Sequence, residues 1–190
     1  MSWPPFSAIS SPMTDDILDR AADAALALAA NQPWPTVSLR EIAVKAEIPF
    51  PDLYAKASSR LAVLAHVSER FDRAALAIDY PQGSNAQDRL FDAVMARLEA
   101  MEPHRTALLN IAKAQGPVIA AARFPLIARA LLEAAGVPAT PPRLLAMAVV
   151  WGRVVQVWRE DDAALNRTMA ELDKRLKQMA QRLGMIGAGF

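Results

Sequence analysis

The sequence predicts an all-α protein, in which a small head of three helices is joined by a fourth helix to a larger helical body. Three observations lead to this fold class. Alanine, leucine, methionine, arginine and glutamate are abundant and runs of β-branched residues are scarce, which favours helices. Apolar residues recur at spacings of three and four, as they do on one face of a helix. Prolines and glycines interrupt this pattern and mark the helix ends.

Composition limits the class of protein. Of the 190 residues, 53% are hydrophobic and 22% are charged, which is enough apolar material for a packed core and too much for a disordered chain. There is no cysteine, so disulfides and thiolate metal sites are excluded, and a cytoplasmic location is expected. The apolar run 144–151 is shorter than the roughly 18 to 20 residues of a transmembrane helix, so we expect no membrane span.

We expect three regions along the chain. Residues 1–13 contain three prolines and several serines with no basic segment ahead of an apolar core, which predicts a flexible tail and not a signal peptide. Residues 14–80 form the head and residues 81–190 form the body. The segment 81–85, Pro-Gln-Gly-Ser-Asn, is typical of a turn and separates the two.

The first two helices of the head have clear limits in the sequence. The first helix starts near Asp15 and ends before Pro33 and Pro35, because neither proline can continue it. The second helix starts at Ser38, since Ser38 and Glu41 have the spacing of a capping box.

The next two helices complete the head. Pro51 suits the first turn of a short third helix, 51–56, and Ser58 or Ser59 caps the fourth. Two short helices joined by a tight turn, with a helix on each side, are typical of a helix-turn-helix unit. The predicted buried stripe of the fourth helix is Leu61, Leu64, Val67, Phe71 and Leu76.

The body is expected to contain five helices, of which the third is kinked or split by Pro125. Their approximate ranges are 86–101, 105–115, 118–135, 142–158 and 163–183. No internal repeat is present.

The head is similar to the helix-turn-helix domain of the TetR family of transcriptional regulators over about 55 residues. The matching segments are Ser38-Leu39-Arg40-Glu41-Ile42-Ala43, Ala46-Glu47-Ile48-Pro49, Leu53-Tyr54 and Ser59-Arg60 with Leu64. The resemblance implies a TetR-like fold, a homodimer and duplex DNA as a partner. The residues placed to contact phosphates are Ser38, Arg40, Lys45, Tyr54, Lys56, Ser59 and Arg60. Those placed to contact bases are Phe50, Asp52 and Lys56.

The departures from the TetR pattern fall where DNA would be touched. Glu47 replaces the turn glycine, Pro49 replaces a serine, and Asp52 places a carboxylate on the recognition helix. Residues 1–80 carry seven basic and ten acidic side chains, a net charge of −3, whereas DNA-binding domains are usually basic. One alternative is therefore a retained fold that no longer binds DNA tightly, with Leu53 and Tyr54 only as core residues.

Part of the body resembles a second family, the coenzyme Q biosynthesis accessory proteins. The matching segments are 94–105 and 161–176. This resemblance implies a TetR-like fold that binds lipid or isoprenoid ligands without binding DNA, and it connects the chain with ubiquinone biosynthesis. The membrane-docking helix that ends that family has no counterpart here, since only residues 184–190 remain.

No catalytic or metal-binding pattern is present. The two histidines, His66 and His104, are isolated and suit packing or surface roles. Glu99 and Glu102 lie near arginines, which indicates an ion-pair network more than an acid–base pair. We therefore expect no enzyme activity, no catalytic residue, no metal and no cofactor.

An apolar small molecule or lipid is the expected ligand of the body, although a plain packed core explains the same residues equally well. The polar groups available to orient a ligand are Arg97, His104, Arg123, Arg153 and Gln156. The candidate ligand-binding residues are Phe91, Met95, Leu98, Leu108, Phe124, Ile127, Leu131, Met147, Val150, Trp151 and Val154.

The last two helices carry apolar stripes with heptad spacing, which predicts a two-fold dimer through a four-helix bundle. The penultimate helix is apolar nearly all round and needs a second partner, although packing within one chain is the alternative for either stripe. The candidate interface residues are Leu144, Ala148, Trp151, Val155, Trp158, Leu165, Met169, Leu172, Leu176, Met179 and Leu183.

Overall fold

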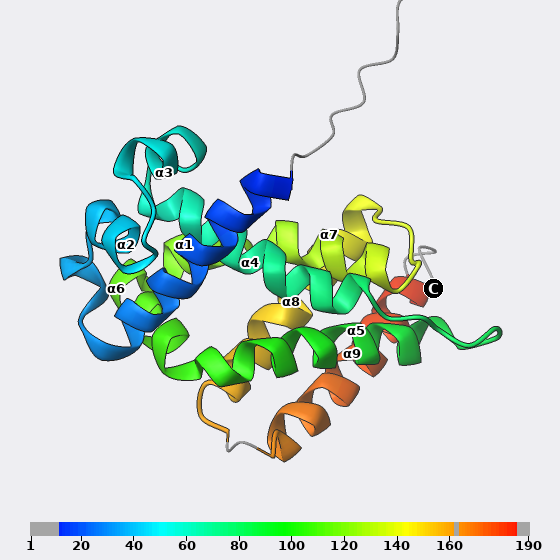
Figure 1. Cartoon of the computed structure of the whole chain (residues 1–190). Coiled ribbons are helices and arrows are strands. Elements are labelled where there is room, and N and C mark those ends of the chain that lie inside the picture. Colours follow the sequence, from blue (N-terminus) through cyan, green and yellow to red (C-terminus); the bar gives the residue numbers. More distant parts are fainter. Residues whose placement is uncertain (1–11, 162–163, 186–190) are drawn as a thin grey trace, which may run out of the picture.

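The computed structural model describes residues 12–161 and 164–185, and within these ranges the secondary structure is helical, without strands. The head contains α1 (Pro12–Asn31), the 3-10 turn η1 (Trp34–Thr36), α2 (Leu39–Lys45), α3 (Phe50–Lys56) and α4 (Arg60–Leu76). In Figure 1, α2 and α3 lie together at one end of the molecule, and α1 packs against α2, α3 and α4. The all-α prediction is confirmed.

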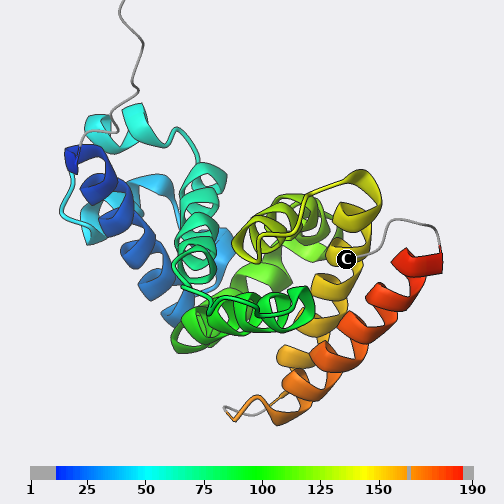
Figure 2. The same ribbon diagram turned by 90° about the vertical axis from the view of Figure 1, so that its right-hand side faces the viewer.

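The body contains α5 (Ala86–Met101), the 3-10 turn η2 (Glu102–His104), α6 (Arg105–Ala121), α7 (Phe124–Ala134), α8 (Pro141–Trp158) and α9 (Asn166–Met185). α8 packs between α7 and α9, and in Figure 2 α9 lies along the outer edge of the body, away from the head. α4 packs against α1 on the head side and against α5 and α7 on the body side. α6 reaches back to α1, where Asn110 donates a 2.9 Å hydrogen bond to the Ala29 carbonyl.

The limits of α2 follow from local hydrogen bonds. The Ser38 hydroxyl accepts the Glu41 N–H at 3.1 Å, and the Ser38 N–H donates to Glu41 Oε2 at 2.6 Å, which is the predicted capping box. These hydrogen bonds with Ser38, more than any burial, hold the pKa of Glu41 below its usual value. The helix stops because Glu47 takes a left-handed backbone conformation with φ of 56°.

Ser59 is the cap of α4, since its hydroxyl accepts the Ala62 N–H at 3.2 Å. This selects Ser59 from the two predicted caps. α3 begins at Phe50, one residue before the predicted start, with Pro51 in its first turn.

The predicted interruption at Gly116 is confirmed, since its φ of 76° breaks the helical run within α6. The predicted split at Pro125 is also confirmed: α6 ends at Ala121, and Pro125 lies in the first turn of α7, where a proline needs no N–H. One predicted start is wrong. The final helix starts at Asn166 and not near 163; residues 162–163 lie outside the described ranges.

The predicted tail 1–13 is shorter than expected, because α1 already begins at Pro12. The rest of that prediction, residues 1–11, lies outside the described residues. Among the helices that the structure describes, none is both long enough and apolar enough to cross a membrane.

Arg20 stabilises the turn after α2. Its guanidinium donates to the carbonyl of Ala46 at 2.5 Å and to that of Glu47 at 2.9 Å. These bonds satisfy acceptors that the helix end leaves without partners. They hold a glutamate in a conformation that glycine adopts at lower cost.

We expect Glu47→Gly to raise the free energy of unfolding by about 0.5–1 kcal/mol. The left-handed conformation costs a residue with a Cβ about 1–2 kcal/mol, and the extra chain entropy of glycine offsets part of the gain. Thermal denaturation followed by circular dichroism measures the change, which corresponds to a rise of about 1–4 °C in Tm. Glu47→Gln is the control, since it removes the charge but keeps the Cβ. A glycine variant that is less stable than the glutamine variant contradicts the strain argument.

Candidate functional site

The α2–α3 face of the head carries several of the predicted DNA-contacting side chains. Arg40, Lys45, Asp52 and Lys56 are exposed, and the Tyr54 side chain is 54% exposed. Leu53, in contrast, is completely buried. The alternative in which Tyr54 is only a core residue is therefore wrong, whereas it is right for Leu53.

The side chains of Arg40, Phe50 and Tyr54 form a stack along the α2–α3 face. The Arg40 guanidinium carbon lies 4.3 Å from the centroid of the Phe50 ring, a cation–π contact. The Phe50 ring in turn lies 5.9 Å from the ring of Tyr54 in a tilted arrangement. The stack fixes the direction of Arg40 and places an aromatic surface between α2 and the exposed side of α3.

Arg60 and Ser59 also make bonds within the head, and their predicted phosphate contacts stay predictions. Arg60 donates to the carbonyl oxygens of Trp34 at 2.8 Å and Val37 at 2.5 Å, and its guanidinium lies 5.4 Å from the Trp34 ring centroid. Ser59 caps α4, and Ser38 caps α2. These polar groups already have partners within the head because helix ends need them.

An ionic cluster ties α1 to α4 on the opposite side of the head. Buried His66 lies 2.7 Å from Asp19 Oδ1, and Arg73 approaches the same oxygen at 3.2 Å. Arg70 adds an ion pair with Asp23 at 2.6 Å. Burial raises the pKa of Asp19, but the hydrogen bond and charge of His66, with the two arginines, outweigh it and lower the pKa below the ordinary value. His66 has the packing role that the sequence predicted for it.

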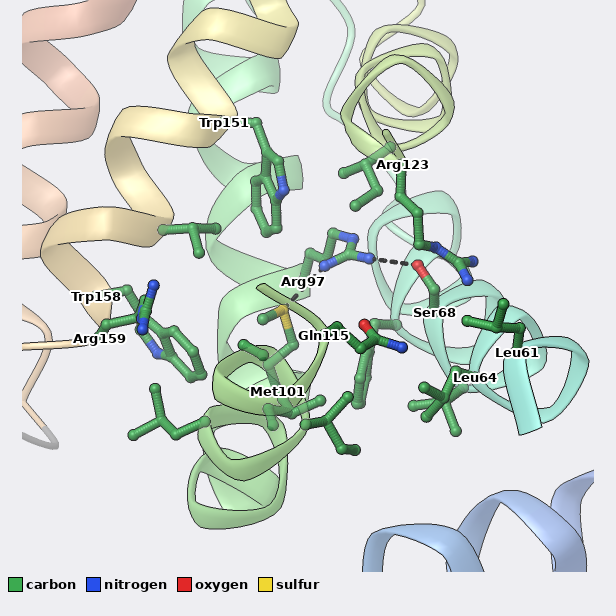
Figure 3. Close-up of a pocket in the computed structure, with 18 residues that line it drawn as sticks. Leu61, Leu64, Ser68, Arg97, Met101, Gln115, Arg123, Trp151, Trp158 and Arg159 are labelled. Carbon is green, nitrogen blue, oxygen red and sulfur yellow. Dashed lines mark hydrogen bonds between the residues drawn. The ribbon is translucent and has the colours of Figure 1, made fainter. Parts of the chain in front are cut away.

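A cavity of about 400 Å³ lies between α4 and the body, a size typical of small-molecule sites. Figure 3 shows its lining side chains, which come from α4, α5, α6, α7 and α8. Most of the wall is apolar or aromatic. The apolar lining residues include Leu64, Phe71, Met101, Ile111, Trp151 and Trp158.

Three of the eleven candidate ligand-binding residues, Leu108, Ile127 and Trp151, line this cavity. Met95, Leu98, Leu131, Met147, Val150 and Val154 are buried in the core between helices and lie outside the lining. Phe91 and Phe124 are partly buried against that core, also outside it. The packed-core alternative fits these eight residues.

The sequence reasoning missed the contributions of α4 and most of those of α6. Leu61, Leu64, Val67 and Phe71 were expected only as a buried stripe, yet all four face the cavity. Leu61 remains 56% exposed, and Leu76, at the end of the same stripe, 52%. Of the predicted polar groups, Arg97 and Arg123 line the cavity, whereas His104, Arg153 and Gln156 do not.

Arg97 is the central polar residue of the cavity wall. Its side chain is almost wholly buried; Nε donates to Asp72 Oδ1 at 2.7 Å and NH2 donates to Ser68 Oγ at 2.9 Å. The guanidinium carbon lies 4.6 Å from the Trp151 ring centroid. Burial lowers the pKa of Arg97, and the Asp72 carboxylate opposes this shift. An arginine stays protonated in such a site, so Asp72 and the ring partners balance its charge.

A second ion pair orients Trp158. Arg105 donates to both carboxylate oxygens of Glu102 at 2.8 Å, and the Trp158 indole N–H donates to Glu102 Oε2 at 2.8 Å. Burial raises the pKa of Glu102, but the bonds from Arg105 and Trp158 outweigh it, and the pKa is lowered. The predicted ion-pair network is thus present for Glu102 and Arg105, and it fixes one aromatic wall of the cavity.

Comparison with known proteins identifies the fold. No protein-family model and no curated protein matches the sequence. A TetR transcriptional regulator from Rhodococcus sp. RHA1 superposes with a TM-score of 0.66 and 15% identity, over 88% of this chain and 97% of that one. A TetR transcriptional regulator from Nitrosomonas europaea ATCC 19718 gives a TM-score of 0.68 and 19% identity, over 90% and 99%. The chain has the TetR fold.

The residues that depart from the TetR sequence pattern between α2 and α3 are compatible with the TetR fold. Glu47 adopts the positive φ for which the family pattern has a glycine. Pro49 is the N-cap of α3, where its missing N–H is not needed, and Pro51 follows in the first turn. Neither of the two neighbours is described as a coenzyme Q accessory protein, so that resemblance stays a prediction.

The predicted dimer stripe lies mostly inside the TetR-fold protomer, and this assignment is corrected. α8 and α9 pack on each other along their length. The buried members are Trp151, Trp158, Leu165, Leu172, Leu176, Met179 and Leu183, and the half-buried members are Leu144, Ala148, Val155 and Met169. A heptad stripe gives the direction of burial but does not say which chain supplies the partner.

A different apolar surface remains exposed on α7 and α8. Leu126 is 65% exposed, Leu145 69% and Val149 48%. The outer side of α9, by contrast, carries exposed charged residues such as Lys174 and Lys177. Within the described ranges, no group of three or more histidine or acidic side chains is placed to hold a metal ion.

We expect Asp72→Ala to lower the free energy of unfolding by about 3–5 kcal/mol, because it leaves the buried Arg97 charge without its partner. Urea denaturation followed by circular dichroism measures the loss. Asp92→Ala, at an exposed position on α5, is the matched control and should change stability by less than about 0.5 kcal/mol. The double variant Asp72→Ala/Arg97→Met should recover part of the loss. Equal stability of Asp72→Ala and Asp92→Ala contradicts the argument that Asp72 balances the Arg97 charge.

Proposed function

We propose that this TetR-fold protein is a transcriptional regulator that acts in the cytoplasm, binds duplex DNA as a homodimer, and responds to a mostly apolar small molecule. It acts by binding and not as an enzyme. The observation that carries this proposal is the cavity of about 400 Å³ whose wall includes α4, the helix that also packs against α1 of the head. A ligand there touches the element that holds the helix-turn-helix.

Ligand binding and DNA binding would be coupled through the contacts that the ligand makes with α4. Five lining residues, Leu61 to Phe71, belong to α4, so a ligand favours the position of α4 that fits it best. A movement of α4 changes the separation of the two heads in a dimer. Both heads reach DNA only when that separation matches half-sites about 34–36 Å apart.

Exposed groups on α2 and α3 support the DNA-binding part. Arg40, Lys45 and Lys56 supply positive charge, and Phe50 with Tyr54 supplies an aromatic surface. Asp52, also exposed, opposes the approach of phosphates. The expected complex therefore has few phosphate contacts and a modest affinity.

A second candidate function is a TetR-fold lipid-binding protein that does not bind DNA. The internal bonds of Arg60 favour it, because they hold Nη1 of one predicted phosphate-contacting cation against backbone carbonyls of the head. The same cavity would then serve a prenyl or acyl ligand alone.

We expect a DNA fragment carrying the promoter of the protein's own gene to be shifted, with binding that falls as salt rises. Lys56→Ala should weaken binding similarly across sequences and reduce the salt slope by about 2, since each head of the dimer loses one phosphate contact. Lys174→Ala, on the outer side of α9, is the control and should change neither. If no fragment is bound even at about 50 mM salt, the lipid-binding candidate is favoured.

The exposed α7–α8 surface is the proposed dimer interface. Its apolar side chains are left uncovered by the protomer, and it lies beside the buried stripe of α8. Light scattering at micromolar concentration should give twice the 20.6 kDa mass of one chain. Leu145→Asp/Val149→Asp should shift the mass towards one chain, because it places two charges in the interface. Leu76→Asp, an exposed leucine of α4, should leave the dimer intact. A parent chain that scatters only as a monomer rules out the dimer.

A further inference from the structure

Four of the five polar side chains that line the cavity are gathered on one side of it. In Figure 3, Arg97, Ser68, Arg123 and Gln115 lie on one side, with the Arg123 side chain directed towards Ser68. Arg159 lies on the opposite side, next to Trp158. No aspartate or glutamate belongs to the lining. The cavity therefore combines an apolar interior with one end rich in hydrogen-bond donors and positive charge.

The charges at this end do not balance. Arg97 is neutralised by Asp72 at 2.7 Å, just behind the wall. Arg123, which is partly buried, pairs with no carboxylate in the described residues; its hydrogen bond is a long one of 3.4 Å to the Ala65 carbonyl on α4. The charge of Arg123 also acts with burial to lower the pKa of Arg97, so the two guanidinium groups repel each other across the site.

An anion between these groups would remove the repulsion. Partly buried guanidinium groups bind carboxylates more strongly than neutral acceptors, because the hydrogen bonds are charge-assisted. Ser68 adds a donor: its oxygen accepts from Arg97, which leaves its O–H free to donate to a ligand. Apart from Arg159, the remaining wall, which includes Leu108, Ile111 and Trp158, offers apolar surface and aromatic rings to the rest of the ligand.

We propose that the cavity binds an anionic amphiphile, a free carboxylic acid with one apolar chain or ring system, whose carboxylate lies between Arg123 and Ser68. The inference rests on the proposed function, since it names the ligand class of the same cavity. It also gives Arg123 a role in the response. A carboxylate that accepts from Arg123 competes with the Ala65 carbonyl, so binding exchanges a bond to α4 for a bond to the ligand.

Paired ligands of equal chain length test the charge requirement. Delipidated full-length protein is titrated with dodecanoic acid and, separately, with dodecan-1-ol, and binding is measured by calorimetry and by the shift in Tm. The acid is expected to bind at least tenfold more tightly than the alcohol. Equal affinity for the two, or binding of neither, overturns the proposal.

Arginine variants test the position of the carboxylate. Arg123→Gln is expected to weaken binding of the acid about tenfold and to leave binding of the alcohol unchanged. Arg129→Gln is the matched control, since Arg129 is exposed on α7, the helix that Arg123 precedes as N-cap, and lies outside the lining. Arg159→Gln should have little effect. Loss of acid binding in the Arg159 variant with none in the Arg123 variant overturns the assigned position. Circular dichroism melting of each variant confirms that it is folded.

The DNA shift without ligand separates this inference from the proposed function. If the acid binds as expected and no DNA is shifted, the regulator proposal fails and the ligand class stands. If DNA is shifted and the acid does not bind selectively, the regulator proposal stands and the ligand class fails.

Discussion

The arrangement of head and body depends on α4, which is buried on two sides, against α1 of the head and against α5 and α7 of the body. On the head side, buried His66 meets Asp19 of α1 at 2.7 Å. On the body side, Asp72 meets Arg97 of α5 at the same distance. A helix that is buried on two sides needs apolar residues on both of them. The buried residues of α4 are accordingly mostly apolar. Head and body are therefore joined by packing along a helix and not by a loose linker.

Local signals in the sequence predicted local structure well. The capping box of Ser38 and Glu41 and the cap at Ser59 were recognisable, because each depends on residues a few positions apart. Gly116 and Pro125 marked where the helical run is interrupted. They did not define the exact limits of α6 and α7, since each is compatible with a kink, an end or a start. The stripes of α8 and α9 gave the buried faces correctly, but periodicity carries no information on whether the partner helix belongs to the same chain.

The cavity was only partly predictable for a related physical reason. A cavity wall and a packed core use the same apolar residue types, so Ile127 and Leu131 look alike in the sequence although only Ile127 faces the cavity. Polar residues were also only partial guides. Of the five predicted to orient a ligand, Arg97 and Arg123 line the cavity, whereas His104, Arg153 and Gln156 do not. Ser68 and Gln115 gave no such signal, since single polar residues are common on helices.

The two guanidinium groups that bind carbonyls in the head have a mechanical consequence. Arg20 from α1 holds the turn between α2 and α3, and Arg60 at the start of α4 holds the segment before α2. A change of angle within the helix-turn-helix would break several of these short bonds at once. Under the proposed function, a ligand in the body would therefore change the direction of the head, while the internal shape of the head stays the same.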